Sequence, residues 1–164
     1  MDGVTLASGS RDGALSLWRL YTTQASATES AAAAASADTS AAETIPTALE
    51  NIATITPFAT AASTAGVTAL AFHPAQWLLL AGSAVGEMLL YQLQQQKELQ
   101  VLYRVQPSHG GHSMTVTCLQ WKPEERRGQG EVQSEESDSV VCWASAGEDH
   151  TVRIHQVAIH SSSA

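Results

Sequence analysis

The chain has 164 residues, 44% of them hydrophobic, and a formal net charge of −8, which together suit one globular domain. Its eight Lys and Arg residues form no basic stripe, so direct nucleic-acid binding is not expected. The sequence contains neither a run of about 18 apolar residues nor a secretory signal, which argues against a membrane protein and a secreted one. We expect a cytoplasmic and nuclear protein in which Cys118 and Cys142 are reduced, buried thiols.

The first predicted element is a β-hairpin within residues 1–21. The stretch LASGSRDGALSLWRL (6–20) contains two apolar strands joined by a turn with Asp12 and Gly13. Residues 22–50 follow as a low-complexity insertion rich in Ala, Ser and Thr, whose alternatives are flexible chain or a transient helix. A weak further strand is predicted within residues 51–62.

Residues 63–108 predict a complete four-stranded unit. A strand, VTALAFHP (67–74), precedes the hairpin LLAGSAVGEMLLYQL (79–93), and ELQVLYRVQ (98–106) supplies a fourth strand. In the first of these strands Val67, Ala69 and Ala71 alternate with Leu70 and Phe72, a period of two that predicts two separate faces.

Residues 109–159 predict one more unit. The strand VTCLQWKP (116–123) matches VTALAFHP, with Trp121 aligned to Phe72, and WASAGEDHTVRIHQV (143–157) aligns without gaps with both earlier hairpins. An acidic loop (124–139) separates its first two strands, and residues 160–164 form a tail. The three aligned hairpins therefore predict three copies of one repeat.

Four short strands in a unit of about 40 residues are typical of a β-propeller blade. The repeats resemble the WD40 repeat family, and the predicted fold is all-β with about two and a half blades. A closed ring takes about four to eight blades, so we expect an incomplete or alternative product. Its open sheet edges should either aggregate or be completed by another chain.

The resemblance implies a polar tetrad in each blade: His before the first strand, Ser in the second, Asp in the hairpin turn and Trp in the third. The first repeat has Ser8, Asp12 and Trp18, and its His would precede Met1. The last repeat has His112, Ser145 and Asp149, with His155 in the Trp position. These seven residues are the predicted site, with a structural role.

The middle repeat lacks the tetrad, because the four positions hold Ser63, Ala81, Val85 and Tyr91. We therefore expect this blade to depend on apolar packing. The predicted packing residues are Leu70, Phe72, Leu79, Leu89 and Tyr91.

Two sharper interpretations of the polar residues carry less weight. Ser, His and Asp could form a hydrolase triad, but WASAG and LASGS lack the G-x-S-x-G elbow. The histidines could bind a metal, yet they fall on separate loops and strands with no Cys-x-x-Cys partner; they are His109, His112, His150, His155 and His160. No catalytic, cofactor-binding or metal-binding residue is predicted.

The resemblance implies a non-catalytic scaffold whose partners are protein subunits of a larger complex. The run GEDHTVRIH (147–155) further resembles the closing repeat of a WD40 subunit that supports a tRNA-modifying assembly. Both long insertions should leave the same face, so we expect partners on the opposite, tight-turn face or along blade edges. A generic interaction module of chromatin or signalling assemblies and, third, a hydrolase remain as alternatives.

Overall fold

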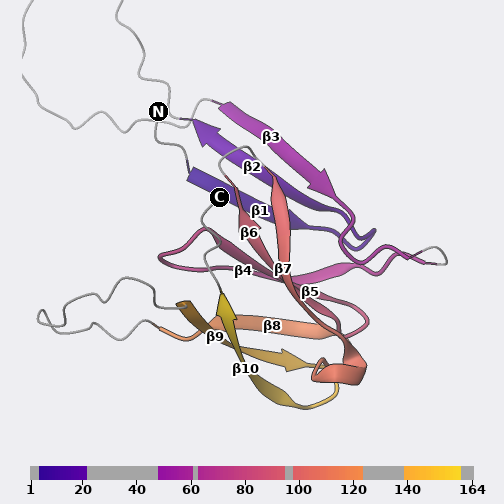
Figure 1. The fold of residues 1–164 in the computed structure, drawn as a ribbon. Coiled ribbons are helices and arrows are strands. Elements are labelled where there is room, and N and C mark those ends of the chain that lie inside the picture. Colours follow the sequence, from indigo (N-terminus) through magenta and orange to yellow (C-terminus); the bar gives the residue numbers. More distant parts are fainter. Residues whose placement is uncertain (1–3, 22–47, 61–62, 95–97, 124–138, 160–164) are drawn as a thin grey trace, which may run out of the picture.

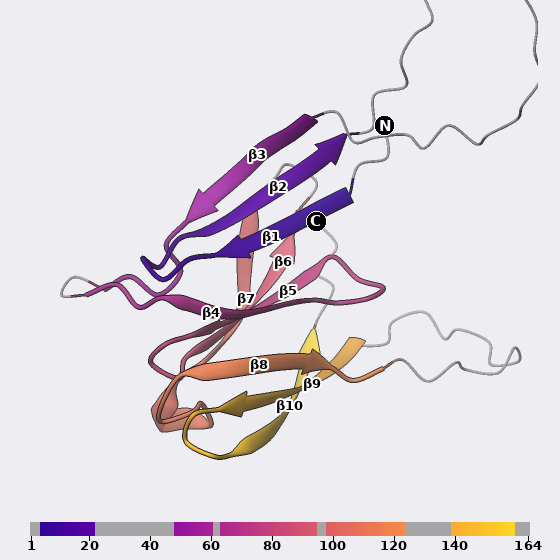
Figure 2. The same cartoon turned by 180° about the vertical axis from the view of Figure 1, so that it is seen from behind.

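The computed structural model describes residues 4–21, 48–60, 63–94, 98–123 and 139–159. Within these ranges the protein forms three antiparallel β-sheets, and the one helix is a single 3₁₀ turn. The sheets follow one another in chain order, with the second sheet between the other two (Figures 1 and 2). The predicted all-β class with about two and a half blades is confirmed.

The first sheet contains three strands in the order β1-β2-β3. Strands β1 (Val4–Gly9) and β2 (Leu15–Tyr21) form the predicted hairpin, in which Leu6 pairs with Trp18. Strand β3 (Ala48–Ile55) pairs with the far side of β2. It begins three residues before the predicted weak strand, because the pairing with β2 continues into residues that we interpreted as part of the insertion.

The second sheet contains all four predicted strands in sequential order. They are β4 (Val67–Phe72), β5 (Leu78–Ser83), β6 (Met88–Leu93) and β7 (Leu99–Val105). This sheet has a neighbour on both faces, and accordingly every residue of β5 is buried. The sequence of β5, LLLAGS, has apolar residues on both faces of the strand, as expected for a strand that lies between two other sheets.

The third sheet follows the 3₁₀ turn η1 (Pro107–His109) and has the order β10-β9-β8. Its strands are β8 (Val116–Trp121), β9 (Ser139–Gly147) and β10 (Val152–Ile159). Strand β10 is the edge of the sheet, with β9 as its only paired neighbour among the described strands.

The repeat is visible in the backbone as well as in the sequence. Register shifts occur at equivalent places in two pairs of sheets. One pair of shifts lies at Leu17/Trp18 and Leu90/Tyr91, where β2 pairs with β3 and β6 pairs with β7, and the other lies at Val67/Ala69 and Val116/Cys118, where β4 pairs with β5 and β8 pairs with β9. The hairpin turns place an equivalent residue at positive φ in all three copies: Gly13 (90°), Gly86 (83°) and His150 (60°). Three hairpins therefore share one turn geometry, although the third fills the left-handed position with a residue other than glycine.

Two apolar cores hold the sheets together, one on each face of the second sheet. The first core joins the first and second sheets and contains Leu15, Leu17, Phe58, Val67, Leu79, Ala81, Leu89 and Tyr91. The second core joins the second and third sheets and contains Leu78, Leu80, Met88, Leu90, Val105, Val116, Leu119, Trp121, Val141 and Trp143. Adjacent residues of one strand, such as Leu79 and Leu80, thus belong to different cores.

The strand-by-strand packing corrects three expectations. Phe72 is 37% exposed, whereas the aligned Trp121 is 3% exposed and donates its indole N–H to the carbonyl of Ala71 at 3.0 Å. Trp121 in the third sheet is covered by β4 of the second sheet. Phe72 faces the first sheet, and the described residues of that sheet include no strand equivalent to β4 that could cover Phe72. Of the five residues expected to pack the middle blade, Phe72 is therefore the exception.

The other two corrections concern Val67 and Cys118. The bulge between Val67 and Ala69 reverses the facing of Val67, which joins the core of Leu70 while Ala69 and Ala71 pack against the other core. Cys118 is exposed rather than buried, and Cys142 is partly buried; both are free thiols on neighbouring strands. The predictions for the Ala-rich insertion from 22 to 47, the acidic loop from 124 to 138 and the tail lie outside the described residues.

Candidate functional site

The predicted His112 is positioned by the turn that precedes β8. Pro107 starts the 3₁₀ turn, and Gly110 ends it at φ 89°. The backbone N–H of His112 then donates to the carbonyl of Gly86 at 3.0 Å, in the hairpin turn of the second sheet. His112 is thereby fixed at the junction of two blades, and its side chain is fully buried.

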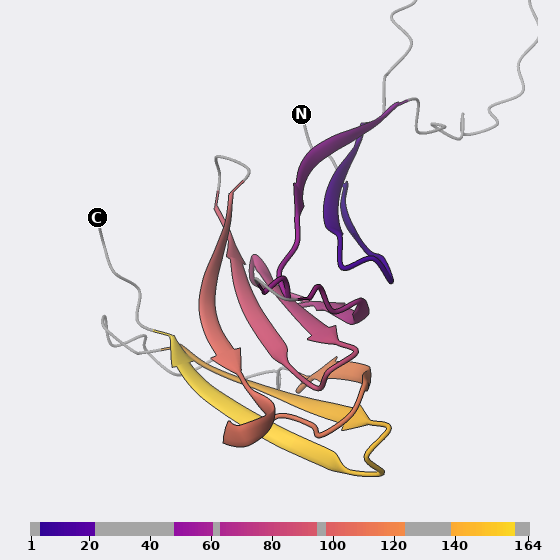
Figure 3. The same cartoon turned by 90° about the vertical axis from the view of Figure 1, so that its right-hand side faces the viewer.

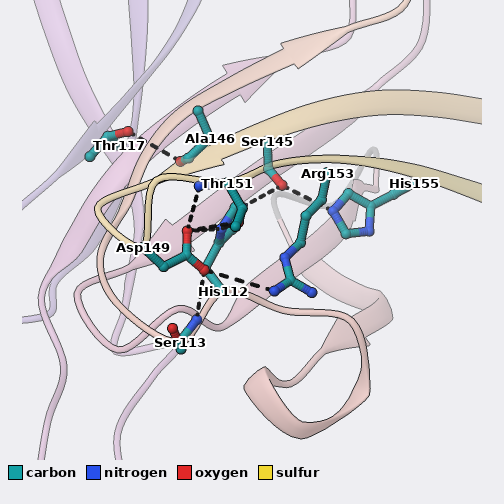
Figure 4. A network of polar contacts seen from close by, with 9 residues as sticks. All are labelled: His112, Ser113, Thr117, Ser145, Ala146, Asp149, Thr151, Arg153 and His155. Carbon is teal, nitrogen blue, oxygen red and sulfur yellow. Dashed lines mark hydrogen bonds and ion pairs between the residues drawn. The ribbon is translucent and has the colours of Figure 1, made fainter.

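The structure brings His112, Ser145, Asp149 and His155 into one chain of hydrogen bonds (Figure 4). The Nδ1 atom of His112 lies 2.9 Å from Oδ1 of Asp149, and its Nε2 atom lies 2.8 Å from Oγ of Ser145. The same Oγ lies 3.0 Å from Nε2 of His155. Four segments contribute one residue each: the turn before β8, the strand β9, the turn between β9 and β10, and the strand β10.

Asp149 anchors one end of this network with more bonds than the sequence indicated. Its Oδ1 accepts from the hydroxyl of Thr151 at 2.8 Å and from the backbone N–H of Thr151 at 3.2 Å, while Oδ2 accepts from the N–H of Ser113 at 3.0 Å. Burial works to raise the pKa of Asp149, but the hydrogen bonds from His112, Thr151 and Ser113 outweigh it and hold the pKa well below 3.8. Asp149 is therefore a carboxylate at neutral pH.

His155 forms the other end, at the position where the resemblance to the WD40 repeat implies Trp. Its ring stacks on Trp143, with centroids 5.1 Å apart and an interplanar angle of 18°. Burial, together with the nearby His112 and Arg153, lowers the pKa of His155 below 6.5 and favours the neutral ring. A neutral His155 that carries its proton on Nε2 donates to Ser145, Ser145 donates to His112, and His112 donates to Asp149, so every bond is satisfied.

The predicted residues of the first hairpin lie together in part. The indole N–H of Trp18 donates to Oγ of Ser8 at 2.9 Å. The carboxylate of Asp12 bonds only locally: it accepts from the N–H of Ala14 at 3.0 Å. Among the described residues, no hydrogen bond joins this carboxylate to a residue outside its turn. That backbone bond is also the main reason why the pKa of Asp12 is lowered.

In the middle blade the equivalent positions hold no such network. Ala81 and Tyr91 are buried in the first core, Val85 is exposed at the hairpin turn, and Ser63 bonds locally with Thr60. Burial raises the pKa of Tyr91 to about 12, so its phenol stays neutral. Apolar contacts have replaced the polar chain at this position of the repeat.

Sequence reasoning missed the partners that the network has outside the predicted residues, and Thr151 and Trp143 are two examples. Thr151 stands two residues after Asp149, a spacing that is typical of a side-chain-capped turn and could have identified it. Trp143 gave no signal, because the aligned positions in the other hairpins hold Leu6 and Leu79. Its role becomes visible only when the stacking with His155 is known.

The order Asp149, His112, Ser145 has the connectivity of an acyl-transfer triad, and the geometry shows why it suits a structural role better. The side chain of Ser145 is 1% exposed and that of His112 is completely buried. The hydroxyl of Ser145 already bonds to two imidazoles, so no attacking position is open to a substrate. In addition, the described residues gather no cluster of three His, Cys, Asp or Glu side chains that could hold a metal ion.

A separate groove lies between the first and second sheets. It is lined by Thr5, Leu17, Arg19, Ile52, Trp77, Leu93, Gln94 and Glu98. Its floor is apolar, Arg19 and Glu98 supply opposite charges, and the indole of Trp77 is largely exposed. It is on the face opposite to the tight hairpin turns, and thus not on the face where we expect partners.

Comparison with known families supports the assignment of the last blade. The family model described as WD domain, G-beta repeat matches residues 103–156, which run from β7 through most of β10 and include the whole polar network. A WD40 repeat is therefore present in this part of the chain. No curated protein matches the sequence. In the part of the chain that the structure describes, no helix is long and apolar enough to cross a membrane.

Proposed function

We propose that this chain is a non-catalytic WD40-type scaffold that binds protein subunits of a larger complex. The buried network from Asp149 to His155 supports this proposal most directly, since it locks the hairpin of the third sheet and engages the Ser145 hydroxyl and both ring nitrogens of His112 in structural hydrogen bonds. Rigid sheets that present loops and edges are suited to recognition of other proteins. We further propose that the protein acts in the cytoplasm and nucleus.

The finer proposal is that the complex is Elongator and that the chain corresponds to the C-terminal part of Elongator complex subunit 2. What supports it is the run from Gly147 to His155, which resembles the closing repeat of that subunit, including a His in the Trp position. The resemblance implies that the chain helps to assemble a complex in which a different subunit modifies the wobble uridines of tRNA. A generic WD40 interaction module fits the repeat equally well.

Affinity purification of the tagged 164-residue chain, followed by mass spectrometry, separates these proposals. Recovery of Elongator subunits supports the finer one, whereas stable recovery of a different assembly overturns it and favours the generic module. His112→Ala, which breaks the network, should reduce recovery, and Ser108→Ala, which removes an exposed Ser–His hydrogen bond, should not. A chain that recovers no partner under any condition overturns the scaffold function.

The hydrolase alternative has its own test. Ser145→Ala is compared with the unchanged chain on activated esters, with circular dichroism as the check on folding. We expect no turnover that depends on Ser145, because its hydroxyl is buried between two imidazoles. Loss of an esterase activity in a folded Ser145→Ala variant would overturn the non-catalytic assignment.

A further inference from the structure

The outer face of the third sheet is largely apolar, and no other described residues cover it. We call it face C; by strand register it contains Cys118, Gln120, Val140, Cys142, Ala144, Ala146, Val152, Ile154, Gln156 and Ala158. Ile154 is 83% exposed and Val152 is 73% exposed. Large apolar side chains on the face of a sheet are usually covered by another layer. A broad apolar patch that is left uncovered marks a contact surface.

The repeat shows what kind of surface covers this face. In the aligned hairpins, Val152 and Ile154 correspond to Leu15 and Leu17 of the first sheet and to Met88 and Leu90 of the second. Those four residues are all buried, each pair against the following sheet. Face C is therefore the surface that accepts the next blade.

The complementary surface lies at the other end of the same chain. We call the outer face of the first sheet face N; it contains Val4, Leu6, Ser8, Ser16, Trp18, Leu20, Leu49, Asn51 and Thr54. Leu6, Ser16 and Trp18 align with Leu79, Leu89 and Tyr91, which form the surface that covers Leu15 and Leu17. Face N is thus of the kind that packs on face C.

The three described sheets of one copy cannot bring these two faces together, because the second sheet stands between the first and third sheets (Figure 3). We propose that two copies of the chain associate head to tail, with face C of each copy packed on face N of the other. Two copies bring six sheets into one ring, within the range of about four to eight that propellers use. Three copies would exceed that range.

The two faces carry no charges that packing would bury. Neither face includes a charged side chain among its strand residues, although the whole chain carries a net charge of −8. Packing the faces together therefore buries no unpaired charge. The inference goes beyond the proposed scaffold function and does not rest on it, because it concerns contacts between copies rather than other subunits.

The mass of the 164-residue chain in solution tests the proposal. Sedimentation equilibrium should give twice 17.3 kDa for the unchanged chain. Ile154→Arg on face C and Leu6→Arg on face N should each raise the dissociation constant about a hundredfold or more, because each would bury an unpaired cation. Val85→Arg, at an exposed hairpin turn outside both faces, is the matched control and should leave the mass unchanged.

Mixing the two variants tests the head-to-tail geometry. The Leu6→Arg chain keeps face C and the Ile154→Arg chain keeps face N, so the mixture should form a two-chain species through one intact contact. A contact of one face with itself would not be restored in this way. A monomeric unchanged chain, a dimer that Leu6→Arg leaves intact, or open polymers in place of a closed pair would each overturn the proposal; circular dichroism verifies that the variants fold.

Discussion

At the scale of single residues, the hydroxyl of Ser145 connects His112 and His155 by a hydrogen bond to each imidazole. Ser145→Ala should lower the free energy of unfolding by about 2 kcal/mol, because buried nitrogens of His112 and His155 lose their partner. Urea denaturation measures this change. Ser108→Ala removes an exposed hydrogen bond to His109 and should change stability by less than about 0.5 kcal/mol. Equal effects of the two substitutions would contradict a stabilising network.

His155 makes the stability depend on pH in a direction that its environment fixes. Because the pKa of His155 is lowered in the folded chain, the unfolded chain binds more protons as the pH falls through 6.5. The free energy of unfolding should therefore decrease between pH 7.5 and 5.5. In His155→Gln, whose amide can still donate to Ser145 but does not titrate, the decrease should be smaller. Identical slopes in urea titrations at several pH values would refute this account.

Local pattern identified the residues of the network better than it identified their surroundings. His112, Ser145, Asp149 and His155 could be located from their offsets in the repeat, and they do lie within hydrogen-bonding distance. The stacking of Trp143 on His155 depends on how two strands pair, which no single stretch of sequence encodes. Spacing along a strand thus predicts position, whereas contacts across strands require the fold.

At the scale of elements, Gly82 near the end of β5 allows the second and third sheets to approach each other closely. A Cβ atom on Gly82 would lie 2.7 Å from Cγ1 of Val116 in the next sheet, and one on Gly9 would crowd Val67 in the same way. Gly82→Ala should therefore cost about 2 kcal/mol of stability through overpacking. In Gly82→Ala/Val116→Ala the penalty should fall short of the sum of the single effects by about 1 kcal/mol.

Gly110→Ala is the control for the coupling between Gly82→Ala and Val116→Ala. Gly110 has a φ of 89° but no atom within 4 Å of an added Cβ, so the substitution introduces backbone strain of about 1 kcal/mol without crowding. It should show no coupling to Val116→Ala in thermal or urea unfolding. Additive effects of Gly82→Ala and Val116→Ala would show that the two sheets do not meet at this glycine.

The elements themselves were predictable to different extents. The hairpins follow from alternating apolar residues around turns with Gly or Asp, and they form as expected. The bulge at Thr68 could not be predicted, since the alternation of VTALAF suggests a regular strand; the Thr68 hydroxyl instead donates to the carbonyl of Val116 at 2.6 Å. Nor did the sequence indicate that Phe72 is partly exposed, with no described strand over it, because this depends on the adjacent sheet.

At the scale of the whole molecule, stability depends on a middle sheet that is shared by two cores. Its strand β5 contributes alternate residues to each side, so the first and third sheets are linked through this strand. A cavity opened on either side therefore weakens the support of the same strand. For this reason we expect the three sheets to unfold as one unit.

Leu79 and Leu80 test this expectation, since they are sequence neighbours that face different cores. Leu79→Ala and Leu80→Ala should each lower the free energy of unfolding by about 2 to 5 kcal/mol, the usual cost of truncating a buried leucine. Hydrogen exchange should speed up in strands of all three sheets in both variants, because opening on one side of β5 releases the other side as well. If Leu79→Ala instead accelerated exchange only in β1, β2 and β3, the first sheet would be an independent unit, and the shared-strand model of stability would be wrong.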